Sequence, residues 1–431
     1  MINTPTLFII TLFFTARLLA NDNVEEAIVQ QIDQHLPQSI NLLKQAVDIN
    51  SGTMNFSGVK QVGMLFKAEF DALGMDTQWL DGKAFGRSGH LQASYLSEDP
   101  QAPKVLLIGH LDTVFSKDDP FQKHSLLDGQ QIAGPGISDM KGGDVIIIAA
   151  LKALKTLGVL EKLSIKVVMT GDEEASGRPL ALSKKALVDA ALWADIALGF
   201  EDGDSDIRTA VTSRRGSVNW GLSVTGRPAH SSQIFSDEVG DGAIFEAARI
   251  LNEFRVQLKD EVLLTLNPGR IAGGTRVTED ADSSSINAFG KTNVVAKTLM
   301  VKGGIRAASP EQLIRAKQRM QQIVSQNLRH TSAVLTFAEG YPPMAQTQAN
   351  LKLLALYNQI SLDLGYNPIT AVNPRNAGAA DISFAASHVD MALDGLGLMG
   401  SGGHTKDEVA DMSSFAKNAH KTAILLYRLA K

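Results

Sequence analysis

Five short, glycine-bearing stretches of the sequence carry histidine and carboxylate side chains that could bind a metal or move a proton. Each lies at or just beyond the end of a predicted strand, and glycine lets the backbone turn sharply there and approach a ligand closely. Taken singly, such residues are more often a surface histidine, a helix cap or a solvated acidic pair. Taken together, they would bring several carboxylates to one edge of a sheet, where their mutual repulsion requires a cation. The stretches are GHLD (109–112), GISDMKGG (136–143), TGDEEASG (170–177), GFED (199–202) and GGHTKDE (402–408).

The sequence has no cysteine, so a metal site in this chain must use His, Asp and Glu. The set matches the needs of a hydrolase with two zinc ions about 3.5–4 Å apart, in which one carboxylate bridges the ions. Each ion then takes one histidine and one further carboxylate, and another glutamate stays unligated to accept a proton from water. Asp112 fits a supporting role, because it can accept a hydrogen bond from the second imidazole nitrogen of His110.

Alternating strands and helices are expected to position these residues. Their periodicity and their glycine boundaries predict an α/β fold with a mostly parallel sheet flanked by helices. In such sheets, ligands gather at the carboxyl ends of the strands, which is where the candidate residues fall. The predicted strands are residues 104–113, 164–174 and 195–202, and the predicted helices here are residues 24–48 and 144–158.

The pattern changes near residue 212 and indicates an inserted domain. An alternating strand at 213–226, helices at 241–254 and 310–326, and strand-like runs between these helices predict a small α+β sandwich. The α/β pattern then resumes and ends with a helix from Ser413 onward. We therefore expect a catalytic domain formed by residues 24–211 and 342–431, and an inserted domain formed by residues 212–341.

The overall composition excludes some classes of partner. The 431 residues are long enough for two or three domains, with 44% apolar and 20% charged residues. The net charge of −5 gives no electrostatic reason to expect binding to nucleic acid or to an anionic membrane.

The N-terminus predicts export. The apolar run at residues 6–14 is too short for a comfortable membrane span and fits a signal peptide over residues 1–20, cleaved after Ala20. No Lys or Arg precedes the run, however, and Leu18 is not the small residue expected near a cleavage site. The alternatives are an uncleaved anchor or a buried N-terminal helix. We expect a secreted or periplasmic protein with no membrane span in its mature form, with a cytoplasmic protein as the alternative.

The motifs resemble those of the glutamate carboxypeptidase, aminoacylase and acetylornithine deacetylase family of co-catalytic zinc hydrolases. The likeness spans nearly the whole chain after the N-terminal segment, and GHLDTV, SDMKGG and DEEASG are specific in this order and spacing. It implies a zinc exopeptidase-like fold, two zinc ions per chain, and an inserted domain that serves as lid and dimerisation domain of a homodimer. Within the family, the resemblance favours a glutamate carboxypeptidase.

The resemblance also implies roles for individual residues around the metals. Asp139 would bridge the two ions, and a cis peptide bond would follow it. Glu173 matches the general base, and Asp112 the residue that supports a metal-binding histidine. The implied metal ligands are His110, Asp139, Glu174, Glu201 and His404.

Residues of the inserted domain are implied to bind the substrate. His230 of TGRPAHSS would reach the partner subunit's active site and donate to the oxyanion, although by itself it would read as a surface histidine beside a turn. Asn293 and Arg306 match residues that bind the substrate's carbonyl and carboxylate. Two departures put the substrate geometry in doubt: Ala296 replaces the usual proline, and the usual aspartate before Arg306 is missing.

Two further positions complete the implied substrate site. Gly378 of GAADIS matches a glycine turn that lines the pocket and would be the point of closest backbone approach. Arg208 falls, after one deletion, where glutamate-releasing members carry a basic residue, and it could pair with a second substrate carboxylate. A solvated arginine in the acidic loop EDGDSDIR is an equally good explanation of Arg208.

The leading hypothesis is a di-zinc hydrolase that cleaves an amide next to a free carboxylate, as a carboxypeptidase that releases C-terminal glutamate or a similar residue. Its substrate would be a small peptide or an N-acyl amino acid. The first alternative is a deacylase of the acetylornithine or succinyl-diaminopimelate type. The second is a non-catalytic binding protein on the same scaffold, against which the retention of every ligand and of the base argues.

Overall fold

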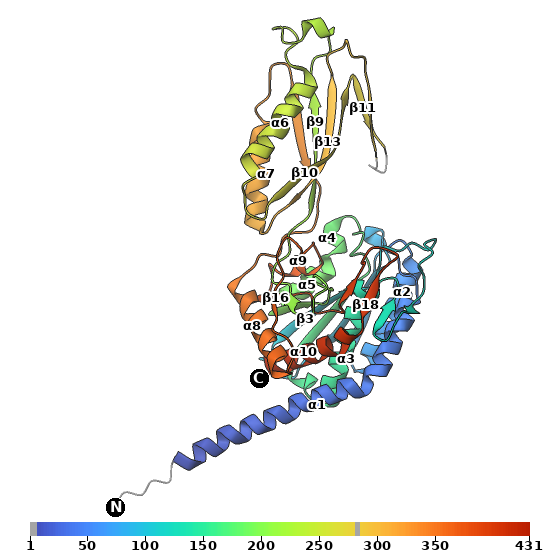
Figure 1. Cartoon of the computed structure of the whole chain (residues 1–431), viewed down its shortest axis with the longest axis vertical. Helices are drawn as coiled ribbons and strands as arrows, with labels where there is room; N and C mark the ends of the chain where they lie inside the picture. The colour runs from blue at the N-terminus through green and yellow to red at the C-terminus, as the bar shows by residue number, and fades with distance from the viewer. Residues whose placement is uncertain (1–6, 281–284) are drawn as a thin grey trace, which may run out of the picture. The chain divides into compact units, whose positions relative to one another are not determined.

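The chain forms two compact units, each with its own core (Figure 1). The computed structural model describes residues 7–280 and 285–431, with side chains described from residue 23 onward. Unit 1 consists of Met1–Thr212, Thr347–Val372 and Phe384–Lys431, and unit 2 consists of Ser213–Gln346 and Asn373–Ser383.

The central sheet of unit 1 has six strands in the order β1-β2-β6-β3-β7-β16. Strands β6, β3, β7 and β16 are parallel, whereas β1 and β2 form an antiparallel edge. In the parallel part His110 pairs with Thr170, and Ile108 with Gly199, so the segments after these strands leave from the same edge. The strands are β1 (Asp76–Asp81), β2 (Gly89–Tyr95), β3 (Lys104–His110), β6 (Ser164–Thr170), β7 (Ile196–Gly199) and β16 (Met391–Leu393).

Helices flank this sheet and supply most of the core. Helix α3 is buried nearly all round, because its Val145–Ile148 run lies among apolar neighbours that include α1 and α10. Burying each such side chain contributes roughly 1.5–3 kcal/mol. The helices are α1 (Leu7–Val47), α2 (Phe56–Ala72), α3 (Gly142–Thr156), α4 (Leu180–Ser183), α5 (Lys185–Trp193), α8 (Gln348–Asp363), α9 (Ile382–Ala385) and α10 (Ser413–Leu429).

A second, smaller sheet of unit 1 joins two distant parts of the sequence. Its order is β17-β18-β5-β4, and Val409 of β18 pairs with Ala133 of β5. This pairing places the segment around His404 beside the segment that leads to Asp139. A separate parallel pair joins β8 to β15. The short strands are β4 (Ser125–Leu126), β5 (Gln131–Ala133), β8 (Thr209–Ala210), β15 (Thr370–Ala371), β17 (Gly400–Ser401) and β18 (Val409–Asp411).

Unit 2 is the α+β sandwich that the sequence predicts. Its antiparallel sheet has the order β10-β13-β9-β14 and packs against two helices, with a separate hairpin of β11 and β12. Strand β9 alternates buried and exposed positions, and its Trp220 meets Phe254 of α6 edge-on at 5.9 Å. The elements are β9 (Val218–Thr225), α6 (Gly242–Leu258), β10 (Thr265–Gly274), β11 (Arg276–Glu279), β12 (Ile286–Phe289), β13 (Thr298–Arg306), α7 (Pro310–Val324) and β14 (Ser332–Phe337).

The limits of unit 2 differ from the expected 212–341 at the C-terminal side. The unit continues to Gln346 and also includes Asn373–Ser383, a segment expected in the catalytic domain. Hydrogen bonds explain the inclusion of Asn373–Ser383: Arg214 Nη1 donates to the carbonyl of Gly378 at 2.9 Å, and the hydroxyl of Tyr341 donates to Asp381 at 3.3 Å. The isolated bridge between Arg214 and Met344 holds the segment after residue 341.

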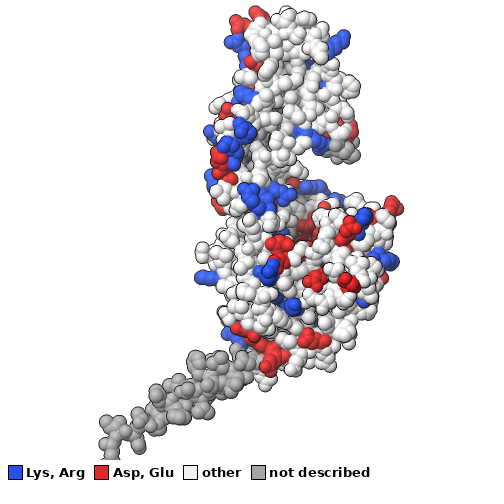
Figure 2. Space-filling view, viewed as in Figure 1, with Lys and Arg blue, Asp and Glu red and all other residues white. Residues whose placement is uncertain are grey.

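The surface and the N-terminus relate to the predictions about charge, membrane spans and the signal peptide. Both basic and acidic side chains are exposed on the face shown in Figure 2, and the net charge of the sequence is −5. Among the described helices, no stretch is both long and apolar enough to cross a bilayer. Of the predicted signal peptide, residues 1–6 lie outside the described residues, and the rest begins helix α1.

Candidate metal centre

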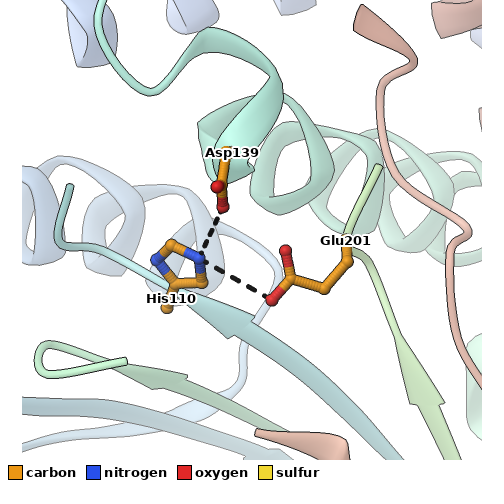
Figure 3. A group of neighbouring side chains, drawn as sticks. All are labelled: His110, Asp139 and Glu201. Atoms are coloured by element: carbon orange, nitrogen blue, oxygen red, sulfur yellow. Dashed lines mark hydrogen bonds and ion pairs between the residues drawn. The ribbon is translucent and has the colours of Figure 1, made fainter. Parts of the chain in front are cut away.

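His110 is the last residue of β3 and lies at the carboxyl edge of the parallel strands. Its side chain is 1% exposed, and its Nε2 lies 3.1 Å from Asp139 Oδ1 and 3.7 Å from Glu201 Oε1 (Figure 3). Glu201 comes two residues after β7, the strand beside β3. One imidazole nitrogen and two carboxylate oxygens thus converge within reach of a single metal ion.

A second group of ligand atoms shares Asp139 with the first. His404 Nε2 lies 2.9 Å from Asp139 Oδ2 and 3.1 Å from Glu174 Oε2. In each group the ligand atoms all lie within 4.8 Å of one another. The two oxygens of Asp139 therefore face different histidines, which is the arrangement that a bridging carboxylate requires. All five predicted ligands are brought together by the fold.

Asp139 is held by the turn Ile137–Lys141, and its peptide bond with Met140 is cis, as the resemblance implies. A buried carboxylate that the sequence analysis did not single out, that of Glu408, lies behind this turn. It accepts hydrogen bonds from the backbone N–H groups of Gly136 at 2.9 Å, Ser138 at 3.0 Å and Asp139 at 3.2 Å. Its position at the end of the GGHTKDE stretch was the only available signal.

His404 reaches the site from the turn between β17 and β18. Its backbone has φ of 62°, in the left-handed region that side-chain-bearing residues rarely occupy. The amide of Thr405 donates to the carbonyl of Gly402 at 3.0 Å and closes the turn. The side chain of His404 is 58% exposed, so this ligand lies on the open side of the site, whereas His110 lies on the buried side.

Asp112 supports His110 differently from the prediction. His110 Nδ1 lies 3.0 Å from the backbone carbonyl of Asp112, whereas the nearest carboxylate oxygen is 3.6 Å away. The carboxylate instead accepts hydrogen bonds from the N–H groups of Glu173 at 3.0 Å and Glu174 at 3.2 Å, and from the hydroxyl of Thr53 at 2.6 Å. Asp112 thus couples the His110 tautomer to the loop that carries both glutamates.

The two neighbouring glutamates occupy different positions. The Glu174 carboxylate belongs to the second ligand group, and Glu173 belongs to neither of the two groups found among the described residues. This difference is compatible with the predicted division into one ligand and one general base, which stays a prediction.

The electrostatics of the site favour positive charge between the carboxylates. Burial works against protonation of His110, but the carboxylates of Asp112, Asp139 and Glu201 raise its pKa well above the usual value. Hydrogen bonds to Asp139 and Glu174 raise the pKa of His404 to about 11. Although burial opposes it, the two imidazoles hold the pKa of Asp139 far below its usual range. A divalent cation bound between the same carboxylates compensates their negative charge better than a protonated imidazole does, because it carries two positive charges. The donor set therefore fits two metal ions.

A model of peptidase family M20/M25/M40 matches residues 106–428, which is most of the chain. The chain belongs to this family. It is accordingly an enzyme, a hydrolase of the metallopeptidase class, and the family resemblance seen in the sequence is confirmed.

Individual members of the M20 family align over most of their length. Carboxypeptidase G2 of Pseudomonas sp. (strain RS-16) is 26% identical over 432 residues, which cover 96% of this chain and 94% of that protein. Succinyl-diaminopimelate desuccinylase of Gluconobacter oxydans (strain 621H) is 23% identical over 335 residues, which cover 72% of this chain and 78% of that protein.

Solved structures confirm the predicted fold. Aminopeptidase PepT from Bacillus cereus ATCC 10987 gives a TM-score of 0.71 at 19% identity, over 91% of this chain and 98% of that one. The YXEP protein of Bacillus subtilis is described as a dinuclear metal binding peptidase from the M20 family. It gives a TM-score of 0.62 at 12% identity, over 91% of this chain and 97% of that one.

Unit 2 of this M20 chain brings together two of the predicted substrate residues. His230 pairs with Val294 in an isolated antiparallel bridge, and the amide of Ser231 donates to the carbonyl of Asn293 at 2.9 Å. His230 and Asn293 are both exposed, and His230 Nδ1 lies 2.8 Å from the hydroxyl of Ser232. Two residues 63 positions apart in the sequence are thus neighbours in the fold.

The remaining predicted residues lie elsewhere. Arg306 is the exposed last residue of β13, and Gly378 is an exposed glycine with open space where a side chain would begin. Arg208 is in unit 1 and pairs with Asp206 through two contacts, Nε to Oδ1 at 2.8 Å and Nη2 to Oδ2 at 2.6 Å. Its guanidinium therefore already has a carboxylate, which favours the solvated alternative for Arg208.

Proposed function

We propose that this chain is a two-zinc carboxypeptidase that releases a C-terminal glutamate or a similar residue from a small peptide or N-acyl amino acid. The observation that carries the proposal is the Asp139 carboxylate, whose two oxygens face His110 and His404 at 3.1 and 2.9 Å. The similarity to carboxypeptidase G2 over 96% of this chain supports the choice of reaction.

In this proposal His110, Asp139, Glu174, Glu201 and His404 hold the ions. When bound there, two zinc ions would polarise the substrate carbonyl as a Lewis acid and would lower the pKa of the attacking water. Glu173 accepts the proton of that water and delivers it to the leaving nitrogen. The Asp112 carboxylate keeps the Glu173–Glu174 backbone in place through its two hydrogen bonds at 3.0 and 3.2 Å.

Residues of unit 2 bind and polarise the substrate in the proposed reaction. His230 donates a hydrogen bond to the developing oxyanion, in the active site of the partner subunit. Asn293 and Arg306 orient the carbonyl and the free carboxylate, and Gly378 allows close backbone approach. The adjacency of the His230 and Asn293 backbones supports this assignment.

A substrate panel tests the reaction. Zinc-loaded protein is assayed with folyl-glutamate, with dipeptides and with N-acetyl amino acids, and we expect release of C-terminal glutamate. If only the N-acyl amino acids are cleaved, the deacylase alternative, supported by the desuccinylase relatives, replaces the carboxypeptidase.

Elemental analysis tests the metal assignment. After loading and dialysis we expect about two zinc ions per chain, because two ligand groups share one carboxylate. Fewer than one ion per chain would instead support a non-catalytic binding protein. Parallel loading with cobalt or manganese shows whether the carboxylate-rich site prefers zinc.

Dimer formation and export are also proposed. Unit 2 exposes apolar side chains around a cavity of about 530 Å³, among them Phe245 and Phe289, at 51% and 56% exposure. Such a patch is consistent with a subunit interface. Light scattering at several concentrations should give the mass of a dimer, which is twice the mass of the mature chain. The mature chain has the 46.2 kDa of the full chain minus the mass of the signal peptide.

N-terminal sequencing tests export. The sequence of the exported protein should begin at Asn21, and an intact Met1 there would rule out cleavage.

A further inference from the structure

Three arginines of unit 2 lie side by side without acidic partners. Arg215 Nη1 donates to the hydroxyl of Thr265 at 3.2 Å, and its Nη2 donates to the backbone carbonyl of Arg375 at 3.2 Å. Thr265 is the cross-strand partner of Arg306 in the sheet. Arg215 is thereby held next to both Arg306 and Arg375, from three separate segments of the chain.

The charges of this cluster are uncompensated. Within the described residues, none of these three guanidiniums forms an ion pair, and the buried Nε of Arg215 has no hydrogen-bond partner. Burial and then the charges of Arg306 and Arg375 lower the pKa of Arg215, although a guanidinium stays protonated in proteins. Like charges so close are unfavourable unless an anion joins them, and a carboxylate matches the guanidinium fork.

We propose that Arg215 and Arg375, beside Arg306, form an anion site that binds a second carboxylate of the substrate. This inference rests on the proposed carboxypeptidase function, because there Arg306 binds the free carboxylate of the released residue. Arg215 adjoins Arg306, so the second carboxylate belongs to the same residue. The substrate class is therefore a peptide or acyl compound that ends in an acidic residue.

Two alternatives for the second carboxylate fit less well. A succinyl group carries its carboxylate on the other side of the scissile amide, away from the carboxylate that Arg306 would bind. Arg208 was the candidate in the sequence, but its guanidinium is paired with Asp206 at 2.6 Å. The buried Nε of Arg215 has no hydrogen-bond partner, whereas Nε and Nη2 of Arg208 already donate to Asp206.

Kinetics on matched substrates test the site. The full-length, zinc-loaded protein is assayed with Ala-Glu, Ala-Gln and N-succinyl-alanine. We expect the wild type to prefer Ala-Glu, and Arg215→Gln to lower the ratio of kcat/KM for Ala-Glu over Ala-Gln by about 10- to 100-fold, the usual value of a charge-assisted contact. Arg375→Gln should lower this ratio in the same direction. Arg270→Gln, which changes an exposed arginine on β10 of the same unit, should leave the ratio unchanged.

The outcomes separate the anion site from the reaction. If C-terminal residues are released but neither variant changes the ratio, the anion site is wrong and the carboxypeptidase stands. A preference for N-succinyl-alanine that Arg215→Gln abolishes would also overturn the placement on the released residue.

Two further outcomes, a variant that does not fold and the absence of any cleavage, need a separate test of the anion site. If Arg215→Gln does not fold, the exposed Arg375→Gln decides. If no substrate is cleaved, the carboxypeptidase proposal fails. The anion site is then tested separately, by measuring the affinity for L-glutamate with calorimetry. Binding that weakens about tenfold or more in Arg375→Gln, but not in Arg270→Gln, supports the site. Equal affinity in all three proteins contradicts it.

Discussion

The metal centre of unit 1 and the substrate residues of unit 2 differ in how firmly the fold holds them. His110, Asp112 and Glu408 are at most 1% exposed, and hydrogen bonds from several segments hold their polar atoms. By contrast, His230, Asn293 and Arg306 are exposed. The buried side of the metal centre thus has directional support, although its ligand His404 is 58% exposed, whereas groups that meet a substrate must all remain accessible.

This comparison predicts that the two regions fail in different ways when altered. Changes around the metals should alter metal content or the chemical step, according to whether a ligand, its support or the base is removed. Changes in unit 2 should leave metal content intact and alter only the handling of substrate.

The largest effect is expected for Glu173→Ala. Loss of the general base should lower kcat by about 10²- to 10⁴-fold, since that is the usual contribution of a positioned base. Metal content should stay near that of the wild type, because Glu173 belongs to neither ligand group. Glu174→Ala is the matched control and should lose metal. Metal loss in Glu173→Ala instead would mean that the two glutamate roles are exchanged.

The next largest effect is expected in unit 2. His230→Ala should lower kcat by about 10²- to 10³-fold through loss of an oxyanion donor, with unchanged metal content. Because the side chain of His230 is exposed and hydrogen-bonds only to Ser232, its removal should also leave thermal stability unchanged. Exposed His388 of unit 1 offers a control, as His388→Ala should retain full activity. Full activity in His230→Ala would show that this histidine is a surface residue with no role in the reaction.

A smaller effect is expected for Glu408→Gln. The amide can replace only part of the carboxylate's hydrogen bonding to the turn before Asp139. Metal affinity should fall by about 10- to 100-fold, as is usual when a ligand loses its support. Competition with a chelating dye measures this, and Asp407→Asn, on the exposed neighbouring residue, provides the comparison. Identical zinc affinity in both variants would show that Glu408 only stabilises the fold.

The smallest effect concerns a buried charge of unit 1 away from the metals. Burial, with Lys417 nearby, lowers the pKa of Lys421 from 10.5 to about 7. Below pH 7 both folded and unfolded states are protonated and the full cost of burial is present. Between pH 7 and 10.5 the unfolded state binds more protons, so stability rises with pH.

Lys421→Met should therefore be more stable than the wild type at pH 7, by on the order of 1–3 kcal/mol, and the gain should shrink at pH 9. Urea unfolding at the two pH values measures the difference, with exposed Lys185→Met as control. A gain that does not depend on pH would mean that packing, and not charge, explains the effect.

Much of the catalytic core follows from local sequence signals. Apolar runs that end in His110, in Glu173–Glu174 and near Glu201 predict neighbouring parallel strands, and the strands β3, β6 and β7 are indeed adjacent. The alternation of buried and exposed positions in β9 likewise predicts the sandwich of unit 2. These signals work because side-chain periodicity and strand ends are local properties of the chain.

The fold class, the family and the residues available for metal binding could therefore be predicted from local patterns in the sequence. Which atoms meet depends instead on long-range packing. The carbonyl of Asp112, and not its carboxylate, lies within hydrogen-bond distance of His110, and the Glu408 carboxylate accepts from the amide of Asp139. Long-range packing likewise brings Arg215, Arg306 and Arg375 into one cluster, while Arg208 is paired with Asp206. Such contacts join segments far apart in the chain, and no local periodicity encodes the direction of a side chain across that distance.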